Sequence, residues 1–126
     1  MRRPLFVLPF LAWAVGCSGS KNDLSDSGAG SCPSLVVSCP TDVADDPSYA
    51  NEVEAILQNN CAVCHSPDGG YGHDLVTYEE VYDQAQEGDL ISWISQCSMP
   101  PSNFPPLTTA QRQTLLDWLA CGAPNN

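Results

Sequence analysis

The sequence predicts an all-α fold of about four short helices in one small domain. Apolar residues recur at helical spacing in several segments, N-capping residues precede those segments, and no stretch alternates as a strand would. Once an apolar N-terminal segment and a polar linker are set aside, about ninety residues remain, enough for a single domain. A core of that size is usually supplemented by cross-links or by a cofactor.

Residues 1–16 have the features of a bacterial signal peptide. Arg2 and Arg3 provide positive charge, and Leu5–Val15 forms an apolar run that is too short to cross a membrane as a helix. The run ends in Ala-Val-Gly-Cys, which resembles a lipobox, so we expect Cys17 to be lipidated and to become the mature N-terminus. The alternative is an ordinary signal peptide cut nearby, with Cys17 unmodified.

Residues 17–47 are expected to form a lipidated N-terminus and a flexible tether. Ser, Gly, Asn and Asp dominate residues 18–31, a composition that cannot bury a core. A diacylglycerol together with an amide-linked acyl chain anchors stably, whereas a single chain binds only marginally. The chain is therefore expected to be exported and held at a bacterial membrane through its N-terminal lipid, as a periplasmic or cell-envelope lipoprotein.

The first helix of the domain is predicted to begin after Ser48 and to run into Cys61. Ser48 is a good N-cap, and the acidic residues just before it lie favourably near a helix N-terminus. Tyr49, Val53, Ile56 and Leu57 recur at helical spacing and give one apolar face. This helix therefore leads directly into a cysteine-containing turn.

Three further helices are predicted over residues 77–85, 89–96 and 109–120. Thr77 with Glu80, and Thr108 with Gln111, form capping boxes at two of them. Gly122 is expected to end the last helix, and the glycine-rich residues 66–72 are expected to form a loop. The residues of these helices expected in the core are Leu90, Ile91, Trp93, Ile94, Leu115, Trp118 and Leu119.

The motif with the clearest chemistry is Cys-Ala-Val-Cys-His, which runs from Cys61 to His65. This spacing is typical of a site that attaches haem c covalently. The thiols of Cys61 and Cys64 add to the two vinyl groups of one porphyrin, and His65 becomes the proximal ligand of the iron. A Cys-x-x-Cys pair alone also fits redox, zinc and disulfide roles, and the adjoining histidine narrows the choice to haem.

Met99 is the leading candidate for the second axial ligand. It is the only methionine besides the initiator, and Pro100 disfavours helical geometry at Met99. Four prolines make residues 99–107, called here the Met99 strap, a stiff segment that could press a thioether against iron. The alternatives are that His73, in the glycine-rich loop, is the ligand, or that Met99 is an ordinary core residue.

The chain contains seven cysteines. With Cys17 assigned to lipid and two others to haem, an even number remains, which predicts two disulfides in an exported chain. The four remaining cysteines are Cys32, Cys39, Cys97 and Cys121. Of the three possible pairings, we favour Cys32–Cys39, which closes a small loop in the tether, and Cys97–Cys121, which joins the ends of two helices.

The chain is strongly acidic, with a formal charge of −11. Loss of Arg2 and Arg3 with the signal peptide leaves Lys21 and Arg112 against fifteen acidic residues, a formal charge of −13. This balance argues against nucleic-acid binding. The acidity serves either solubility alone or electrostatic steering toward a redox partner protein with a basic docking surface.

Together these features resemble a small class I cytochrome c domain, over about Tyr49 to Cys121. The resemblance rests on the opening helix, Cys-x-x-Cys-His, the Met-Pro strap and a terminal Leu-Leu-x-Trp-Leu helix. The strap, with Leu-Thr-x-x-Gln and Ala-Cys-Gly-Ala-Pro after it, is also similar to haem domains of exported bacterial lipoproteins. The resemblance implies that residues 48–126 form a cytochrome c-like domain in which the first and last helices cross and His65 and Met99 ligate one low-spin haem. Two features depart from the usual pattern, namely the short separation of 34 positions between these ligands and the pair Cys97 and Cys121.

The function expected from these residues is electron transfer, not catalysis. Two axial ligands leave no open position for a substrate, and methionine ligation raises the reduction potential. One alternative is a haem-based gas or peroxide sensor or enzyme in which Met99 is labile. The other is a haem-free surface lipoprotein in which Cys61 and Cys64 form a disulfide.

Overall fold

The structure is a computed structural model and describes residues 32–42 and 46–126. The predicted signal peptide, the lipidation site at Cys17 and residues 18–31 of the predicted tether lie outside the described residues. Within the described part of the chain all regular structure is helical and no strand forms, so the predicted all-α class is confirmed. None of the helices in this part is long and apolar enough to span a membrane.

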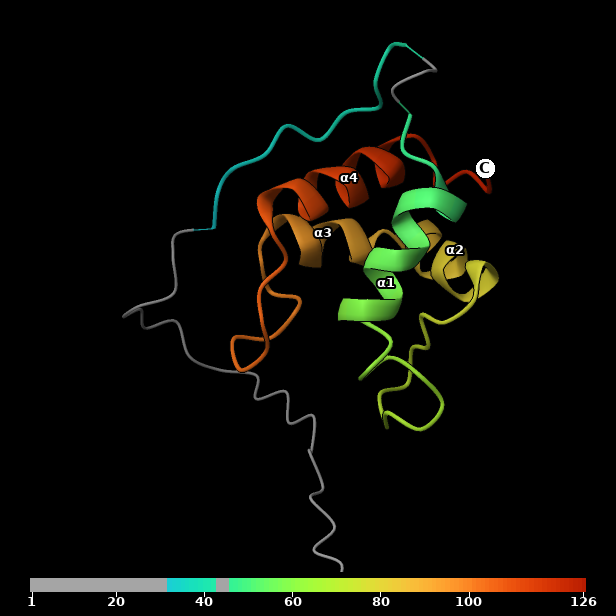
Figure 1. Ribbon diagram of the computed structural model, residues 1–126, viewed down its shortest axis with the longest axis vertical. Helices are drawn as coiled ribbons and strands as arrows, with labels where there is room; N and C mark the ends of the chain where they lie inside the picture. The colour runs from blue at the N-terminus through green and yellow to red at the C-terminus, as the bar shows by residue number, and fades with distance from the viewer. Residues whose placement is uncertain (1–31, 43–45) are drawn as a thin grey trace, which may run out of the picture.

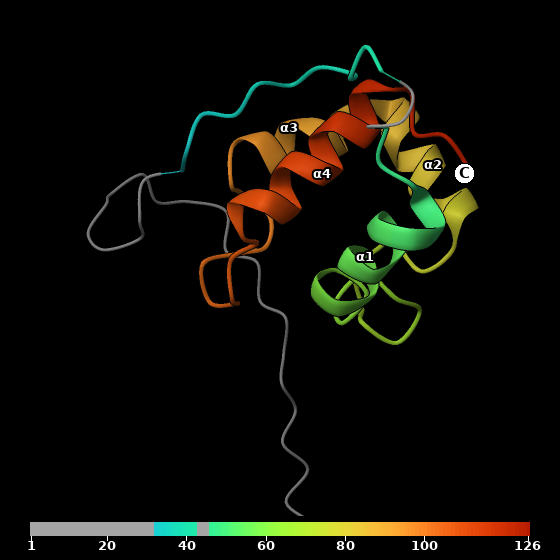
Figure 2. The same cartoon turned by 45° about the horizontal axis from the view of Figure 1, so that its top comes forward.

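The described helices are a π-helical turn and four α-helices (Figure 1). They are η2 (Tyr49–Val53), α1 (Glu54–Asn60), α2 (Tyr78–Glu87), α3 (Asp89–Ser95) and α4 (Thr109–Ala120). η2 continues directly into α1, α4 packs against both η2 and α3, and α2 packs against α3. In Figure 2, α4 lies alongside α3, and α4 also packs against η2.

The predicted helix starts are confirmed by their capping contacts. Thr77 and Thr108 each form a capping box, with Glu80 and Gln111 respectively. Ser48 caps the first helix, but its first turn is π-helical because the Val53 amide bonds to the Ser48 carbonyl, five residues back. α2 extends two residues beyond the predicted end, to a left-handed Gly88 at its C-cap.

The core gathers around Trp118, which is fully buried on α4. Tyr49 and Tyr78 contribute rings to the same cluster, with Tyr49 5.7 Å from Trp118 and 5.0 Å from Tyr78 between ring centroids. The chain after α4 folds back onto this cluster, since the Trp118 indole donates to the Pro124 carbonyl. The buried apolar residues are Tyr49, Val53, Leu57, Leu75, Val81, Leu90, Ile94, Leu107, Leu115, Leu116, Trp118 and Ala123. Of the residues expected in the core, Ile91, Trp93 and Leu119 are only half-buried.

The predicted disulfide pairing is wrong. The structure pairs Cys32 with Cys97 and Cys39 with Cys121. Arg112 of α4 bonds to the carbonyl at the end of α3, next to Cys97, whereas Cys121 lies nine residues further along α4, about 14 Å in axial rise. Cys97 thus lies toward the start of α4 and Cys121 at its end, and each is bonded to a cysteine of residues 32–42.

The N-terminal segment, residues 32–42, is tied to the helices and is not a free tether with its own small loop. It runs parallel to α4, with one disulfide near each end of that helix (Figures 1 and 2). Between the two disulfides, the Gln113 side-chain amide donates to the Val36 carbonyl at 2.7 Å. The two disulfides therefore join residues 32–42 to the helices, and the Cys32–Cys39 loop predicted in the tether does not form.

Candidate functional site

The Cys-x-x-Cys-His motif forms a tight turn at the end of α1. The Cys61 and Ala62 amides both donate to the Leu57 carbonyl, and the Cys64 and His65 amides donate to the Cys61 carbonyl. These bonds continue the helical winding past Asn60. They place the side chains of Cys61, Cys64 and His65 on one wall of a pocket.

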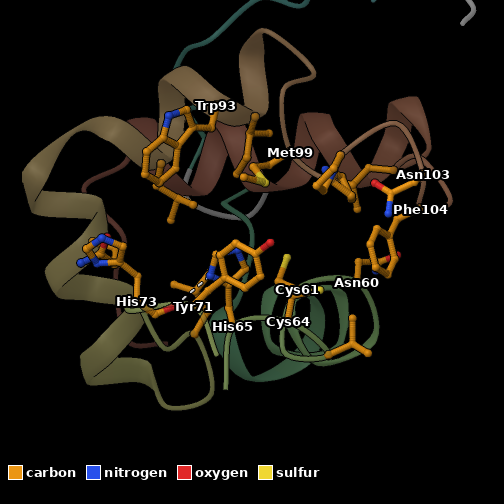
Figure 3. Close-up of a pocket in the computed structure, with 18 residues that line it drawn as sticks. Asn60, Cys61, Cys64, His65, Tyr71, His73, Trp93, Met99, Asn103 and Phe104 are labelled. Atoms are coloured by element: carbon orange, nitrogen blue, oxygen red, sulfur yellow. Dashed lines mark hydrogen bonds between the residues drawn. The ribbon is translucent and has the colours of Figure 1, made fainter. Parts of the chain in front are cut away.

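The pocket has a volume of about 870 Å³, which includes the open solvent at its mouth. Its lining is mainly apolar and includes no acidic residue, lysine or arginine. Its walls come from the motif turn, the loop after it, α3 and the Met99 strap (Figure 3).

His65 is held at two points by the loop that follows it. Its Nδ1 lies 2.9 Å from the His73 carbonyl oxygen, and its own carbonyl accepts the Leu75 amide at 2.8 Å. Because a carbonyl can only accept, Nδ1 is the donor, and in the neutral imidazole Nε2 then keeps its lone pair. This is the arrangement that a metal-ligating histidine needs. The Tyr71 ring packs beside the imidazole, with centroids 5.8 Å apart.

Met99 lines the same pocket from the wall opposite His65 (Figure 3). Its amide and that of Ser98 both donate to the Trp93 carbonyl of α3, at 3.3 and 3.0 Å. The Met99–Pro100 peptide bond is cis. The structure thus brings together all four residues that the sequence assigned to haem, which are Cys61, Cys64, His65 and Met99.

His73 contributes its backbone to the His65 side of the pocket. Its carbonyl accepts from the His65 imidazole, so its main chain is fixed next to the candidate proximal ligand. The exposed His73 side chain lines the pocket at its edge, away from Met99 (Figure 3). This placement favours Met99 over His73 as the group that faces His65.

The two cysteines of the motif differ in state. Cys61 is the free cysteine among the described residues, and burial raises the pKa of its thiol to about 11. Cys64 is disulfide-bonded, and the free Cys61 is not its partner. The expectation that a haem-free protein would pair Cys61 with Cys64 is therefore wrong.

The loop after the motif packs against it at Gly69. The Gly69 amide donates to the Ser66 carbonyl, and a Cβ atom at position 69 would overlap the carbonyl oxygen of Cys64. A side chain at this position would therefore push the loop away from the motif.

Sequence reasoning placed Trp93 in the core and assigned no role to Tyr71 or Phe104. All three line the pocket. Tyr71 could have been found from the sequence, because it is a large aromatic side chain between two glycines, Gly70 and Gly72, in a predicted loop. Such a ring is expected to pack against a neighbouring surface. Trp93 has no such signal, since its register on α3 is that of a core residue.

Comparisons of this chain with protein-family models, with curated proteins and with solved structures find no match.

Proposed function

We propose that this protein is a single-haem c-type cytochrome that transfers electrons at a bacterial membrane. The observation that carries the proposal is the apolar pocket itself. One wall presents Cys61, Cys64 and a correctly protonated His65, and the opposite wall presents Met99.

The residues of the pocket match what haem c requires. Two cysteine sulfurs and an imidazole lie on one wall and a thioether on the other, which is the donor set of a His/Met cytochrome. The apolar lining suits a porphyrin ring. The Asn103 amide and the Trp93 indole N–H, which are also in the lining, are available to the propionates.

The haem would supply a one-electron Fe(III)/Fe(II) couple. His65 is oriented by the His73 carbonyl, so Nε2 needs no reorganisation to act as a ligand. Met99 would hold the iron from the wall opposite His65, would favour its ferrous state and would leave no open position for a substrate. These roles suit an electron carrier rather than an enzyme.

The charge of the described residues supports a basic partner protein. Arg112 is the only lysine or arginine in residues 32–126, and it is buried. The outer surface of this part therefore carries acidic side chains without compensating lysine or arginine. Such a surface steers association with a positively charged redox partner. Lipidation at Cys17 would hold the carrier close to membrane-bound partners.

One observation favours the haem-free alternative. Cys64 is disulfide-bonded, and a thioether to haem requires this sulfur as a thiol. The proposal therefore includes reduction of that disulfide before haem attachment by a dithiol reductant, which takes up the disulfide itself and releases Cys64 as a thiol. The sensor alternative needs a labile Met99 and is distinguished by tight binding of carbon monoxide to the ferrous protein without denaturant.

The direct test is the mass of the peptide that contains Cys61–His65, from protein co-expressed with a cytochrome c maturation system. We expect this peptide to carry one haem that survives denaturation. The matched control is the double variant Cys61→Ser/Cys64→Ser, which should carry none. A wild-type peptide with two carbamidomethylated cysteines and no haem, obtained after reduction, would rule the proposal out.

A further inference from the structure

The two disulfides of the described residues lie in opposite electrostatic environments. The Arg112 guanidinium Nη2 lies 3.4 Å from the sulfur of Cys32, in the Cys32–Cys97 bond. The carboxylate Oδ1 of Asp46 lies 3.9 Å from the sulfur of Cys39 and 3.8 Å from that of Cys121. One disulfide is thus next to a cation, and the other is next to an anion.

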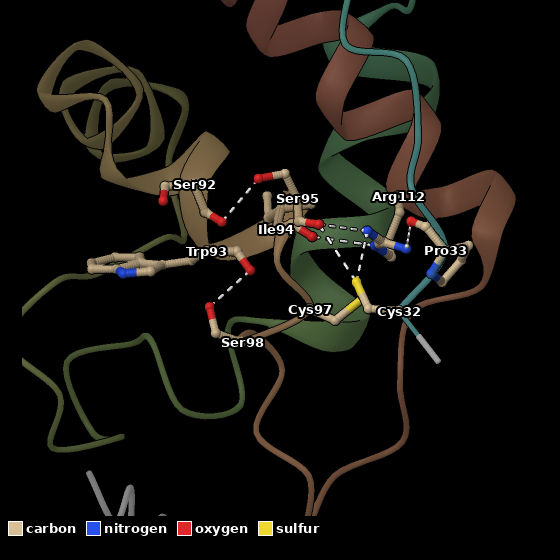
Figure 4. Close-up of a disulfide and its surroundings, with 9 residues drawn as sticks. All are labelled: Cys32, Pro33, Ser92, Trp93, Ile94, Ser95, Cys97, Ser98 and Arg112. Atoms are coloured by element: carbon tan, nitrogen blue, oxygen red, sulfur yellow. Dashed lines mark hydrogen bonds between the residues drawn. A yellow bond between two sulfur atoms is a disulfide. The ribbon is translucent and has the colours of Figure 1, made fainter. Parts of the chain in front are cut away.

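The guanidinium is held in this position by backbone carbonyls. Its nitrogens donate to the carbonyls of Ile94, Ser95 and Pro33 at 3.2, 3.0 and 3.3 Å (Figure 4). No acidic residue neutralises Arg112 through a hydrogen bond among the described residues. The Arg112 side chain is 3% exposed, so the guanidinium is shielded from water on all sides but that of the exposed Cys32.

We propose that Cys32–Cys97 is a redox-active disulfide that dithiols reduce selectively, whereas Cys39–Cys121 is a structural bond that resists them. A nearby cation lowers the pKa of a thiol, and a thiol of lower pKa is a better leaving group in thiol–disulfide exchange. A nearby carboxylate has the opposite effect and also repels the attacking thiolate.

Reduction of Cys32–Cys97 proceeds in two exchange steps. A thiolate of the dithiol attacks the Cys97 sulfur, forms a mixed disulfide with it and expels Cys32 as a thiolate next to Arg112. The second thiol of the reagent then attacks the mixed disulfide, which releases Cys97 and leaves the reagent as its own disulfide. The protein disulfide gains two electrons, the dithiol loses two, and its two protons go to the released sulfurs or to solvent.

Other properties of the two bonds are closely matched, so charge is the main difference between them. Cys32 and Cys39 are both exposed, and Cys97 and Cys121 are both half-buried. The bonds join residues 65 and 82 positions apart. Because loop entropy depends only on the logarithm of loop length, it separates them little.

Reduction at this site acts on the Met99 strap. Cys97 lies two residues before Met99, in the left-handed region with a φ of 54°. The disulfide fixes that turn to the N-terminal segment, and the Trp93 carbonyl holds its other side (Figure 4). This consequence rests on the proposed function: opening the bond loosens the ligand strap, weakens the Met99–iron bond and lowers the reduction potential.

The primary test compares the two disulfides within the same wild-type molecules. The folded protein is incubated with graded dithiothreitol, quenched with an alkylating reagent, and each cysteine peptide is quantified by mass spectrometry. We expect Cys32 and Cys97 to become alkylated about tenfold faster than Cys39 and Cys121, or more. Equal rates, or faster labelling of Cys39 and Cys121, would overturn the proposal.

Two variants test the electrostatic cause. Asp46→Asn removes the carboxylate at low steric cost and should raise the reduction rate of Cys39–Cys121 several-fold while sparing Cys32–Cys97. Arg112→Gln should slow the reduction of Cys32–Cys97 by about tenfold. If the Arg112 variant fails to fold, Asp46→Asn alone tests the electrostatic cause. An unchanged rate of Cys39–Cys121 reduction in Asp46→Asn would contradict the proposal that nearby charge sets the reduction rates.

The effect on Met99 is measured separately with the variants Cys32→Ser/Cys97→Ser and Cys39→Ser/Cys121→Ser. In haem-loaded protein the first should weaken the far-red absorption band of methionine ligation, and the second should leave that band intact. Oxidation of Met99 by peroxide is the readout that needs no haem, and it should be faster only in the first variant. If the wild-type protein carries no haem, the cytochrome proposal is rejected. Faster Met99 oxidation in Cys32→Ser/Cys97→Ser would then still support the link between this disulfide and the Met99 strap. Equal oxidation rates in both variants would reject the coupling.

Discussion

The imidazole Nδ1 of His65 lies 2.9 Å from the carbonyl oxygen of His73. This contact joins the Cys-x-x-Cys-His turn to the far end of the loop that follows it. It fixes the protonated nitrogen of His65 and leaves Nε2 as the ligand atom. The contact uses the backbone of His73, so the His73 side chain is free to vary without loss of the candidate proximal ligand.

Met99→Ala is expected to leave haem covalently attached but to remove the far-red band and lower the reduction potential. The fall should be on the order of 0.1 V, since axial ligation sets potentials over about 0.8 V. Spectroelectrochemical titration of the purified protein measures both effects. His73→Ala is the matched control, because it keeps the carbonyl that holds His65, and it should change neither. A loss of the far-red band in the His73 variant alone would show that the ligand assignment is wrong.

Gly69→Ala is expected to disrupt the loop that packs on the motif. The added Cβ would overlap the Cys64 carbonyl oxygen, so the loop must shift, at a cost of about 1–3 kcal/mol. Urea unfolding and the yield of haem-loaded protein measure the effect. Gly72→Ala is the control, since a Cβ at that position meets nothing within 4 Å. Equal stability of the two variants would contradict the close packing of this loop.

The Cys61 thiol is expected to resist alkylation at neutral pH in the haem-free protein. Burial raises its pKa to about 11, so little thiolate forms near pH 7. The rate of reaction with iodoacetamide, followed on the peptide that contains Cys61, should rise with pH to a midpoint near 11. In urea-unfolded protein the midpoint should return to about 8.5. A midpoint near 8.5 in the folded protein would show that the thiol is not buried.

The same pKa shift makes folding pH-dependent. Below the ordinary thiol pKa, Cys61 is protonated in both the folded and the unfolded chain, so it causes no change of the free energy of unfolding with pH. Between that value and about 11 the unfolded chain loses the Cys61 proton while the folded chain keeps it, so stability falls as pH rises. The wild type should therefore lose more stability over this range than Cys61→Ala, measured by urea unfolding at each pH.

Thr108→Ala is expected to destabilise the protein by about 1 kcal/mol. The Thr108 hydroxyl accepts the Gln111 amide at the start of α4, and this bond is lost in the variant. Thr109→Ala is the matched control on the neighbouring exposed residue and should be close to neutral. Thermal unfolding of both variants measures the difference, and equal melting temperatures would argue against the cap.

Local signals in the sequence predicted most of the helical structure. The capping boxes at Thr77 and Thr108 and the stop at Gly122 are set by residues three or four positions apart, so the chain predicts them without knowledge of the fold. Likewise, the spacing of Cys61, Cys64 and His65 is local, and these residues lie together on one wall of the pocket.

Relationships between distant segments could not be predicted. The disulfide pairing depends on the path of residues 32–42 along α4 and on the antiparallel placement of α3 and α4, which no periodicity encodes. The role of Arg112 was missed for the same reason. Its partners are carbonyls of Pro33, Ile94 and Ser95, and backbone groups leave no signal in the sequence.

The most direct test of the cytochrome assignment is the absorption spectrum of oxidised and reduced protein co-expressed with a maturation system. We predict a sharp ferrous α-band at the c-type position, together with a weak far-red band in the oxidised protein. The first reports covalent haem at Cys61 and Cys64, and the second reports Met99 as a ligand. A spectrum without a haem band, from protein whose Cys61 and Cys64 are otherwise intact, would contradict the account.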